Sequence, residues 1–120
     1  MLEILYPRRC AVCDEIEVTG KGICPLCKDK VHVAGEPACK KCGKPLVDER
    51  KEFCTDCGKK HHVYTQGKAV FVYEGGIRNS MYRFKYGNKR EYAEFYANAA
   101  VEKYGVWLNK IKAEVLIPIP

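Results

Sequence analysis

Eight cysteines, arranged as four C-x-x-C pairs, are the residues of this sequence best suited to chemistry. The pairs are Cys10/Cys13, Cys24/Cys27, Cys39/Cys42 and Cys54/Cys57. Their first members lie 14, 15 and 15 residues apart, which indicates one small unit repeated along the chain. A C-x-x-C turn brings two thiolates to one point, and two such turns complete the tetrahedral sulfur shell that Zn²⁺ prefers. The spacing therefore predicts two zinc centres, each with four cysteine ligands.

Sequential ligation is the pairing that we favour. It joins Cys10/Cys13 with Cys24/Cys27, and Cys39/Cys42 with Cys54/Cys57, whereas a cross-brace would interleave the four pairs. Redox-active dithiols and an iron–sulfur cluster are weaker alternatives, because four regularly spaced motifs are more simply explained as zinc ligands. Four thiolates fill each zinc shell, so we predict structural centres and surface positions for the histidines, which are His32, His61 and His62.

The residue after the second cysteine of a C-x-x-C turn often needs a positive φ. Gly43 and Gly58 meet this requirement, and Asp14 tolerates it. Lys28 fits it less well, so we expect the first ribbon to be the less regular of the two.

The composition changes near residue 60. All eight cysteines precede Gly58, whereas seven of the eight tyrosines and the only tryptophan follow it. We therefore predict a double zinc ribbon over residues 1–60, in which the metal replaces a hydrophobic core, and a second unit over 61–120. Neither an export signal nor an apolar run long enough to span a membrane is visible, which predicts a cytoplasmic protein without membrane insertion.

The formal charge of +6 overstates how basic the protein is. A zinc ion with four thiolates carries a net −2, so two centres lower the total to +2. The lysines beside the cysteines offset this negative charge locally. A high isoelectric point alone is therefore weak evidence for nucleic-acid binding.

Four elements are expected in the second half. Residues 67–76 ("GKAVFVYEGG") read as a strand that needs cover on both faces. A short helix follows over 76–90, with Ile77, Met81 and Phe84 on its buried side. A second helix over about 89–104 carries an aromatic stripe and is expected to end at Gly105. Residues 113–120 ("AEVLIPIP") read as the start of a buried parallel strand.

The order of these motifs is similar to that of a known family. "LYPRRCAVC", "CPLC", "CKKCG" and "CTDCG" are followed by "AVFVYEGGIRNSMYRFKYGNKR" and "VLIPIP". Together they resemble the N-terminal part of the competence-protein F (ComF) family. Its members are double-zinc-ribbon, phosphoribosyltransferase-like proteins. The resemblance extends over essentially all 120 residues.

The resemblance implies a zinc-ribbon module followed by the start of an α/β type I phosphoribosyltransferase-like domain. It also implies a cytoplasmic role in natural transformation, with single-stranded DNA and competence or DNA-processing proteins as partners. The family's loop for phosphoribosyl pyrophosphate has no counterpart here, so we expect that cofactor only in a longer family member and no catalysis by this chain alone. The alternative is a stand-alone zinc-ribbon module that binds nucleic acid or a protein partner.

A basic, aromatic segment is the candidate for nucleic-acid contact. No acidic residue lies between Glu74 and Glu91. The candidate residues within this interval are Arg78, Tyr82, Arg83, Lys85, Tyr86, Lys89 and Arg90. Cations that meet phosphates and rings that stack on bases suit single strands. The alternative is a solvated helix face whose tyrosines pack on the domain.

Overall fold

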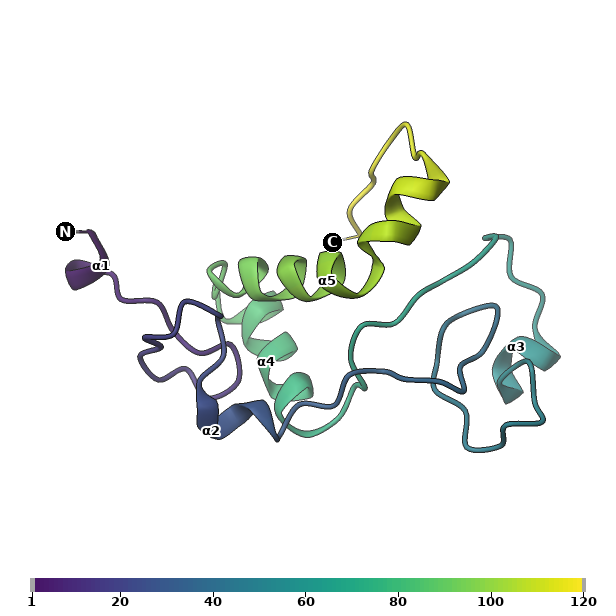
Figure 1. The fold of residues 1–120 in the computed structure, drawn as a ribbon, viewed down its shortest axis with the longest axis horizontal. Coiled ribbons are helices and arrows are strands. Elements are labelled where there is room, and N and C mark those ends of the chain that lie inside the picture. Colours follow the sequence, from purple (N-terminus) through teal and green to yellow (C-terminus); the bar gives the residue numbers. More distant parts are fainter. Residues whose placement is uncertain (1, 120) are drawn as a thin grey trace.

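A computed structural model describes residues 2–119 of the chain. These described residues form five helices, which are α1 (Leu2–Leu5), α2 (Pro25–Lys28), α3 (Thr55–Lys59), α4 (Gly75–Tyr86) and α5 (Tyr92–Ile111). The molecule is elongated, with extents of 51 × 33 × 27 Å. The first cysteine cluster and helices α4 and α5 form one body, and the segment that carries α3 lies apart from them at one end (Figure 1).

The two ribbons are structural copies of each other, offset by 29 residues from Cys10 to Cys39. In each, the first cysteine N–H donates to a carbonyl five residues later, on Glu15 and on Lys44, at 2.8 Å. The residue after the first C-x-x-C turn has a positive φ, 65° at Asp14 and 77° at Gly43. The second C-x-x-C turn instead begins a helix, α2 or α3. Gly58 lies inside α3, so the positive φ predicted for it is wrong.

One hydrophobic core joins the first ribbon to the long helices. Ala11, Ile77, Tyr92 and Phe95 are buried together. Val12 is also buried and lies so close to Gly76 that a Cβ added there would be 2.7 Å from Val12 Cγ1. These contacts connect residues on both sides of position 60. The division of the chain into two domains near this position stays a prediction. Burial of this apolar surface is the main stabilising term apart from the metal.

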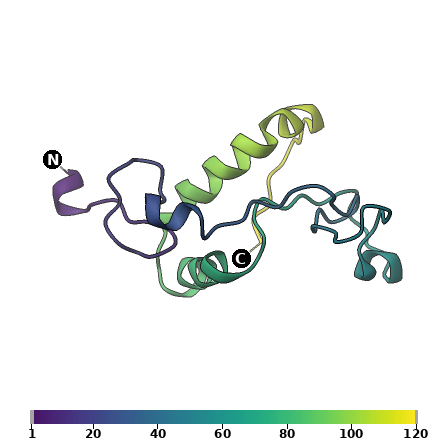
Figure 2. The same cartoon turned by 60° about the horizontal axis from the view of Figure 1, so that its bottom comes forward.

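The second ribbon is attached through two extended segments. Ala34 N–H donates to Val70 O at 2.9 Å and Val72 N–H to His32 O at 2.8 Å, so these segments run antiparallel (Figure 2). Further out, Gly67 N–H donates to Lys41 O at 2.6 Å. The two extended segments form a stalk, and α5 contacts this stalk where Tyr104 OH donates to Ala69 O at 2.7 Å.

The helix predictions are largely confirmed, and the strand predictions are not. Ile77 is buried, and Met81 and Phe84 are half-buried, on the inner side of α4 as expected, but α5 continues through Gly105 to Ile111. Residues 67–76 form a single bridge, from Phe71 to Val33, instead of a strand. Residues 113–119 are exposed and unpaired, and Pro120 lies outside the described residues. A strand forms only where a neighbouring strand accepts its backbone hydrogen bonds, and the described residues supply none for 113–119.

Gly43 and Gly58 provide a matched test of how the second ribbon is built. A Cβ on Gly43 would lie 2.8 Å from Ala69 N and 2.9 Å from Lys68 Cα, in addition to the strain of its positive φ. Gly58 has open space around it. We expect Gly43→Ala to destabilise the second ribbon by at least about 1–2 kcal/mol, the usual cost of a left-handed L-residue, and Gly58→Ala to be neutral or slightly stabilising. Retention of the second zinc ion against a chelator measures both effects, and equal retention would contradict the packing at Gly43.

Candidate metal centres

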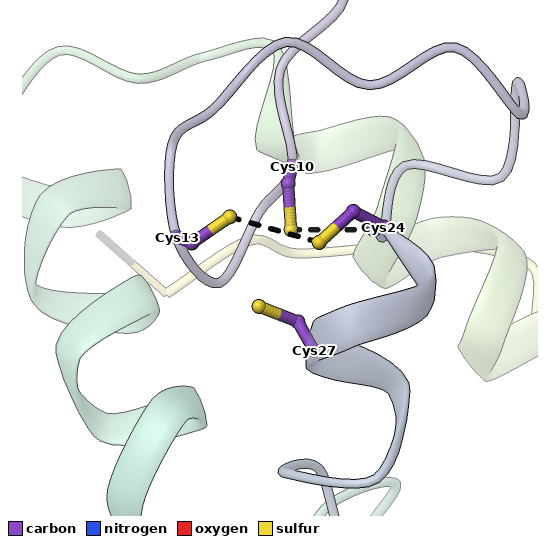
Figure 3. A group of neighbouring side chains, drawn as sticks. All are labelled: Cys10, Cys13, Cys24 and Cys27. Carbon is purple, nitrogen blue, oxygen red and sulfur yellow. Dashed lines mark hydrogen bonds between the residues drawn. The ribbon is translucent and has the colours of Figure 1, made fainter.

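The eight cysteines lie in two separate clusters. Cys10, Cys13, Cys24 and Cys27 form the first, and Cys39, Cys42, Cys54 and Cys57 form the second. The sulfur atoms of each cluster all lie within 4.8 Å of one another. In the first, the four sulfurs point toward a common centre between the turn at Cys10–Cys13 and the start of α2 (Figure 3). This arrangement confirms sequential pairing and excludes the cross-brace.

The sulfur spacing fits a zinc ion better than a disulfide. Cys13 Sγ and Cys24 Sγ are 3.7 Å apart, and so are Cys42 Sγ and Cys54 Sγ. Four sulfurs at about 2.3 Å from a tetrahedral centre are roughly 3.8 Å from one another. A disulfide would need about 2.05 Å. Each cluster can therefore hold one zinc ion, for a total of two.

Backbone N–H groups make one thiol in each cluster unusually acidic. Burial acts to raise the pKa of Cys10, but N–H groups of Cys13, Cys24 and Val12 outweigh it and lower the pKa to about 7. The equivalent groups, including those of Cys42 and Cys54, lower the pKa of Cys39 to about 6 against the same opposing burial. These N–H groups favour the thiolate, which is the form that binds metal.

The last cysteine of each cluster behaves in the opposite way. Burial and the neighbouring sulfurs raise the pKa of Cys27 to about 12, and likewise that of Cys57. A metal must therefore displace protons from the remaining thiols, so zinc binding releases protons and weakens as the pH falls.

The two centres differ in what surrounds them. The turn of the first contains Ala11, which is buried against α4 and α5, and Val12, which is buried beside Gly76 of α4. The turn of the second contains Lys40 and Lys41, and Lys40 forms an exposed ion pair with Glu52. The first centre therefore belongs to the core, and the second stabilises its own ribbon.

Polar contacts that the sequence did not reveal tie the first centre to the helices. Tyr92 OH donates to Asp14 Oδ1 at 2.5 Å, and Lys89 Nζ lies 2.9 Å from Asp14 Oδ2. Burial acts to raise the pKa of Asp14, but these two partners lower it below its usual range. Arg83 donates to the carbonyl of Val12. In the sequence, the apolar pair inside "CAVC" indicates only that this turn is buried. The cysteine spacing gives no sign that Asp14 contacts Tyr92.

The histidines lie outside both clusters of metal ligands among the described residues. His32 Nδ1 lies 2.9 Å from Glu74 Oε1 at the surface. His62 stacks on Tyr64, with 5.2 Å between ring centroids.

The candidate nucleic-acid residues fall into two groups. Arg83 and Lys89 are engaged with the first ribbon, through Val12 and Asp14. Arg78, Tyr82, Lys85 and Tyr86 lie on the outer side of α4, and Arg90 is exposed just before α5. This geometry is compatible with either a DNA-binding face or a solvated helix face, so nucleic-acid contact stays a prediction.

Comparison with known families agrees with the cysteine geometry. Residues 1–58 match the double zinc ribbon domain, which is just under half of the 120-residue chain. No curated protein and no solved structure gives a significant match. Within residues 2–119, none of the helices has the length and apolar character needed to cross a bilayer. Residues 1–58 are thus a double zinc ribbon domain with two four-cysteine sites.

Proposed function

We propose that this chain is the zinc-stabilised N-terminal part of a ComF-like, phosphoribosyltransferase-family protein that handles single-stranded DNA in natural transformation. Its two zinc centres are structural, because four thiolates leave no open coordination position for a substrate. In this proposal the first ribbon holds α4 and α5 in place, and α4 presents the DNA-binding surface.

The observation that carries the proposal is the outer face of α4. Arg78, Tyr82, Lys85 and Tyr86 occupy one side of this helix, opposite the buried residues Ile77 and Ser80. The Tyr82 and Tyr86 residues are 66% and 74% exposed, with ring centroids 5.1 Å apart. Two exposed rings beside two cations match the requirements of a single strand, in which bases stack and phosphates meet positive charge.

A second observation supports the phosphoribosyltransferase-like part. Val115, Leu116 and Ile117 follow α5 as an exposed apolar run. Such a run suits a strand that is buried when neighbouring strands pair with it. This matches the place that the family resemblance gives to "VLIPIP".

Binding of a labelled oligothymidylate tests the DNA-binding surface. We expect Arg78→Ala with Lys85→Ala to weaken binding and to reduce the slope of log K against log salt by about 1.4, or about 0.7 for each phosphate that is no longer neutralised. Tyr82→Ala and Tyr86→Ala should each cost about 1–3 kcal/mol, because a base can no longer stack on the ring.

Lys110→Ala, at the far end of α5, is the matched control for removal of one positive charge. Arg83 is unsuitable for this test because it holds the carbonyl of Val12. If the Arg78/Lys85 variant binds DNA with unchanged affinity and salt slope, α4 is not the binding surface.

The second candidate function is a docking module. The second ribbon lies apart from the core and exposes Val47 fully and Phe53 by half. Val47→Asp with Phe53→Ser should then abolish binding to a protein partner while leaving zinc content and oligothymidylate binding unchanged. Loss of oligothymidylate binding in this variant would place the DNA contact on the ribbon instead.

A further inference from the structure

A basic pocket of about 340 Å³ lies at the start of α5. Three segments form its walls: Arg8 and Arg9 before the first zinc turn, the loop at 20–22, and residues 90–98. Arg90 connects it in sequence to the face of α4, because only residues 87–89 separate it from Tyr86. The pocket is distinct from both zinc centres and lies beyond the four residues of the DNA-binding surface proposed on α4; of the residues predicted to contact nucleic acid, it contains Arg90.

The cations of the pocket outnumber its acids. It contains Arg8, Arg9, Lys21 and Arg90 against Glu91 and Glu94. Arg8 pairs with Glu94 at 3.4 Å across the surface, and Arg9 donates to the backbone oxygen of Asp14 at 2.8 Å. Lys21 and Arg90 form no ion pair with the residues that the structure describes. Two positive charges are therefore available to a ligand.

The loop that carries Lys21 is held in a fixed shape. Gly20 and Gly22 have φ of 73° and 74°, which other residues adopt only with strain. The buried carboxylate of Glu17 accepts the N–H groups of Thr19 and Gly22, the latter at 3.0 Å. Gly22 also packs on α5, since an added Cβ would lie 3.0 Å from Phe95 Cβ. Lys21 therefore needs little reordering of its backbone to meet a ligand.

The start of α5 carries the positive end of the helix dipole together with two carboxylates, of which Glu94 is paired with Arg8 and Glu91 with Lys89. This helix has 20 residues, and its N-cap residue, Glu91, makes no side-chain hydrogen bond to the first turn. The partial positive charge of a helix N-terminus favours anions. Here it acts together with the charges of Lys21 and Arg90 and a formed cavity, so the ligand is expected to be an anion of small size.

We propose that this pocket binds a phosphate group, with Lys21 and Arg90 as its charged contacts. The source of this phosphate is inferred from the proposed function. If a single DNA strand lies along α4, it continues past residues 87–89 and places one phosphodiester in the pocket. A free phosphate compound presents the same chemistry. Lys21 and Arg90 belong to different walls of the pocket, and a phosphate, unlike a carboxylate, presents oxygens in several directions to meet both.

Two titrations test the inference, one with oligothymidylate and one with inorganic pyrophosphate. Each uses the full chain and is monitored by the amide signals in NMR spectra. Shifts of the amide signals of Gly20, Gly22 and Ala93 report on the pocket, and those of Arg78 and Lys85 report on α4. We expect Lys21→Ala with Arg90→Ala to remove the pocket shifts and to lower the salt slope of oligothymidylate binding by about 0.7, the value for the one phosphate that the pocket neutralises. Unchanged zinc content shows that the fold is kept, and Lys110→Ala, which removes one positive charge away from the pocket, should leave the pocket shifts unchanged.

The outcomes separate the two proposals. Pocket shifts with oligothymidylate that disappear in the double variant support both. Pocket shifts with pyrophosphate, together with no shift at α4 or the pocket with oligothymidylate, support the pocket and overturn the DNA function. Shifts confined to α4, with no effect of the double variant, overturn the pocket and leave the DNA function standing. Absence of pocket shifts with either probe overturns the pocket.

Discussion

Cys10→Ser should unfold the body formed by the first ribbon and helices α4 and α5. Cys10 is fully buried, and its sulfur accepts N–H groups of Val12 and Cys24 at 3.4 Å. Structural zinc in a small domain contributes about 10–16 kcal/mol of apparent binding free energy, which is as large as the total stability of a typical domain, about 5–15 kcal/mol. Losing this centre removes the fixed position of Ala11 and Val12 in the shared core.

The measurement is far-UV circular dichroism together with zinc content. We expect most of the helical signal to disappear, because α4 and α5, of 12 and 20 residues, are the long helices and pack on the first ribbon. A variant that loses one zinc ion but keeps its helical signal and melting temperature would show that the helices are stable without the first centre.

Cys39→Ser should destabilise the second ribbon as strongly as Cys10→Ser destabilises the first, and it should leave the stability of α4 and α5 almost unchanged. The second ribbon has Lys40 and Lys41 in place of an apolar turn, and its link to the rest passes through the two extended segments of the stalk, near residues 32–34 and 67–72. Loss of this centre should unfold residues 39–60 and reduce the zinc content from two ions to one. The reason is that the turn at Lys40 and Lys41 shares no core with α4 or α5 within residues 2–119.

Amide NMR separates the two effects. In Cys39→Ser, the signals of residues in α4 and α5 should keep their positions, while those of the second ribbon collapse to unfolded values. Movement of signals throughout α4 would mean that the second centre also supports the core, contrary to the separation of the second ribbon from α4.

The cysteine spacing was sufficient to predict the candidate site. Each C-x-x-C turn has short-range geometry that a metal fixes, so the pairing could be inferred without tertiary information. The different roles of the centres depended on two residues, Ala11 and Val12, whose apolar character contrasts with Lys40 and Lys41. The partners of Ala11 and Val12 in α4 and α5 lie more than 60 positions away, and spacing carries no information about such contacts.

The helices were predicted from periodicity, but their ends were not. Gly105 lies within α5 although glycine costs about 1 kcal/mol in a helix relative to alanine. Tyr104 and Trp107 on either side of it hold the helix to the stalk, where Lys68 Nζ lies 5.7 Å from both ring centroids. Tertiary packing therefore outweighs the local stop signal. The strand predictions were not confirmed: residues 67–76 form one bridge and 113–119 are unpaired, because a strand depends on partners that local sequence cannot specify.

The central claim is that two zinc ions are held by sequential sets of four cysteines. The most direct test is native mass spectrometry, after a chelator challenge, of two double variants. Cys13→Ser with Cys24→Ser damages only the first set, so we predict that one zinc ion is retained. Cys13→Ser with Cys42→Ser damages both sets and should retain none. The reverse result, none in the first variant and one in the second, would mean that the pairs are interleaved and would contradict sequential ligation.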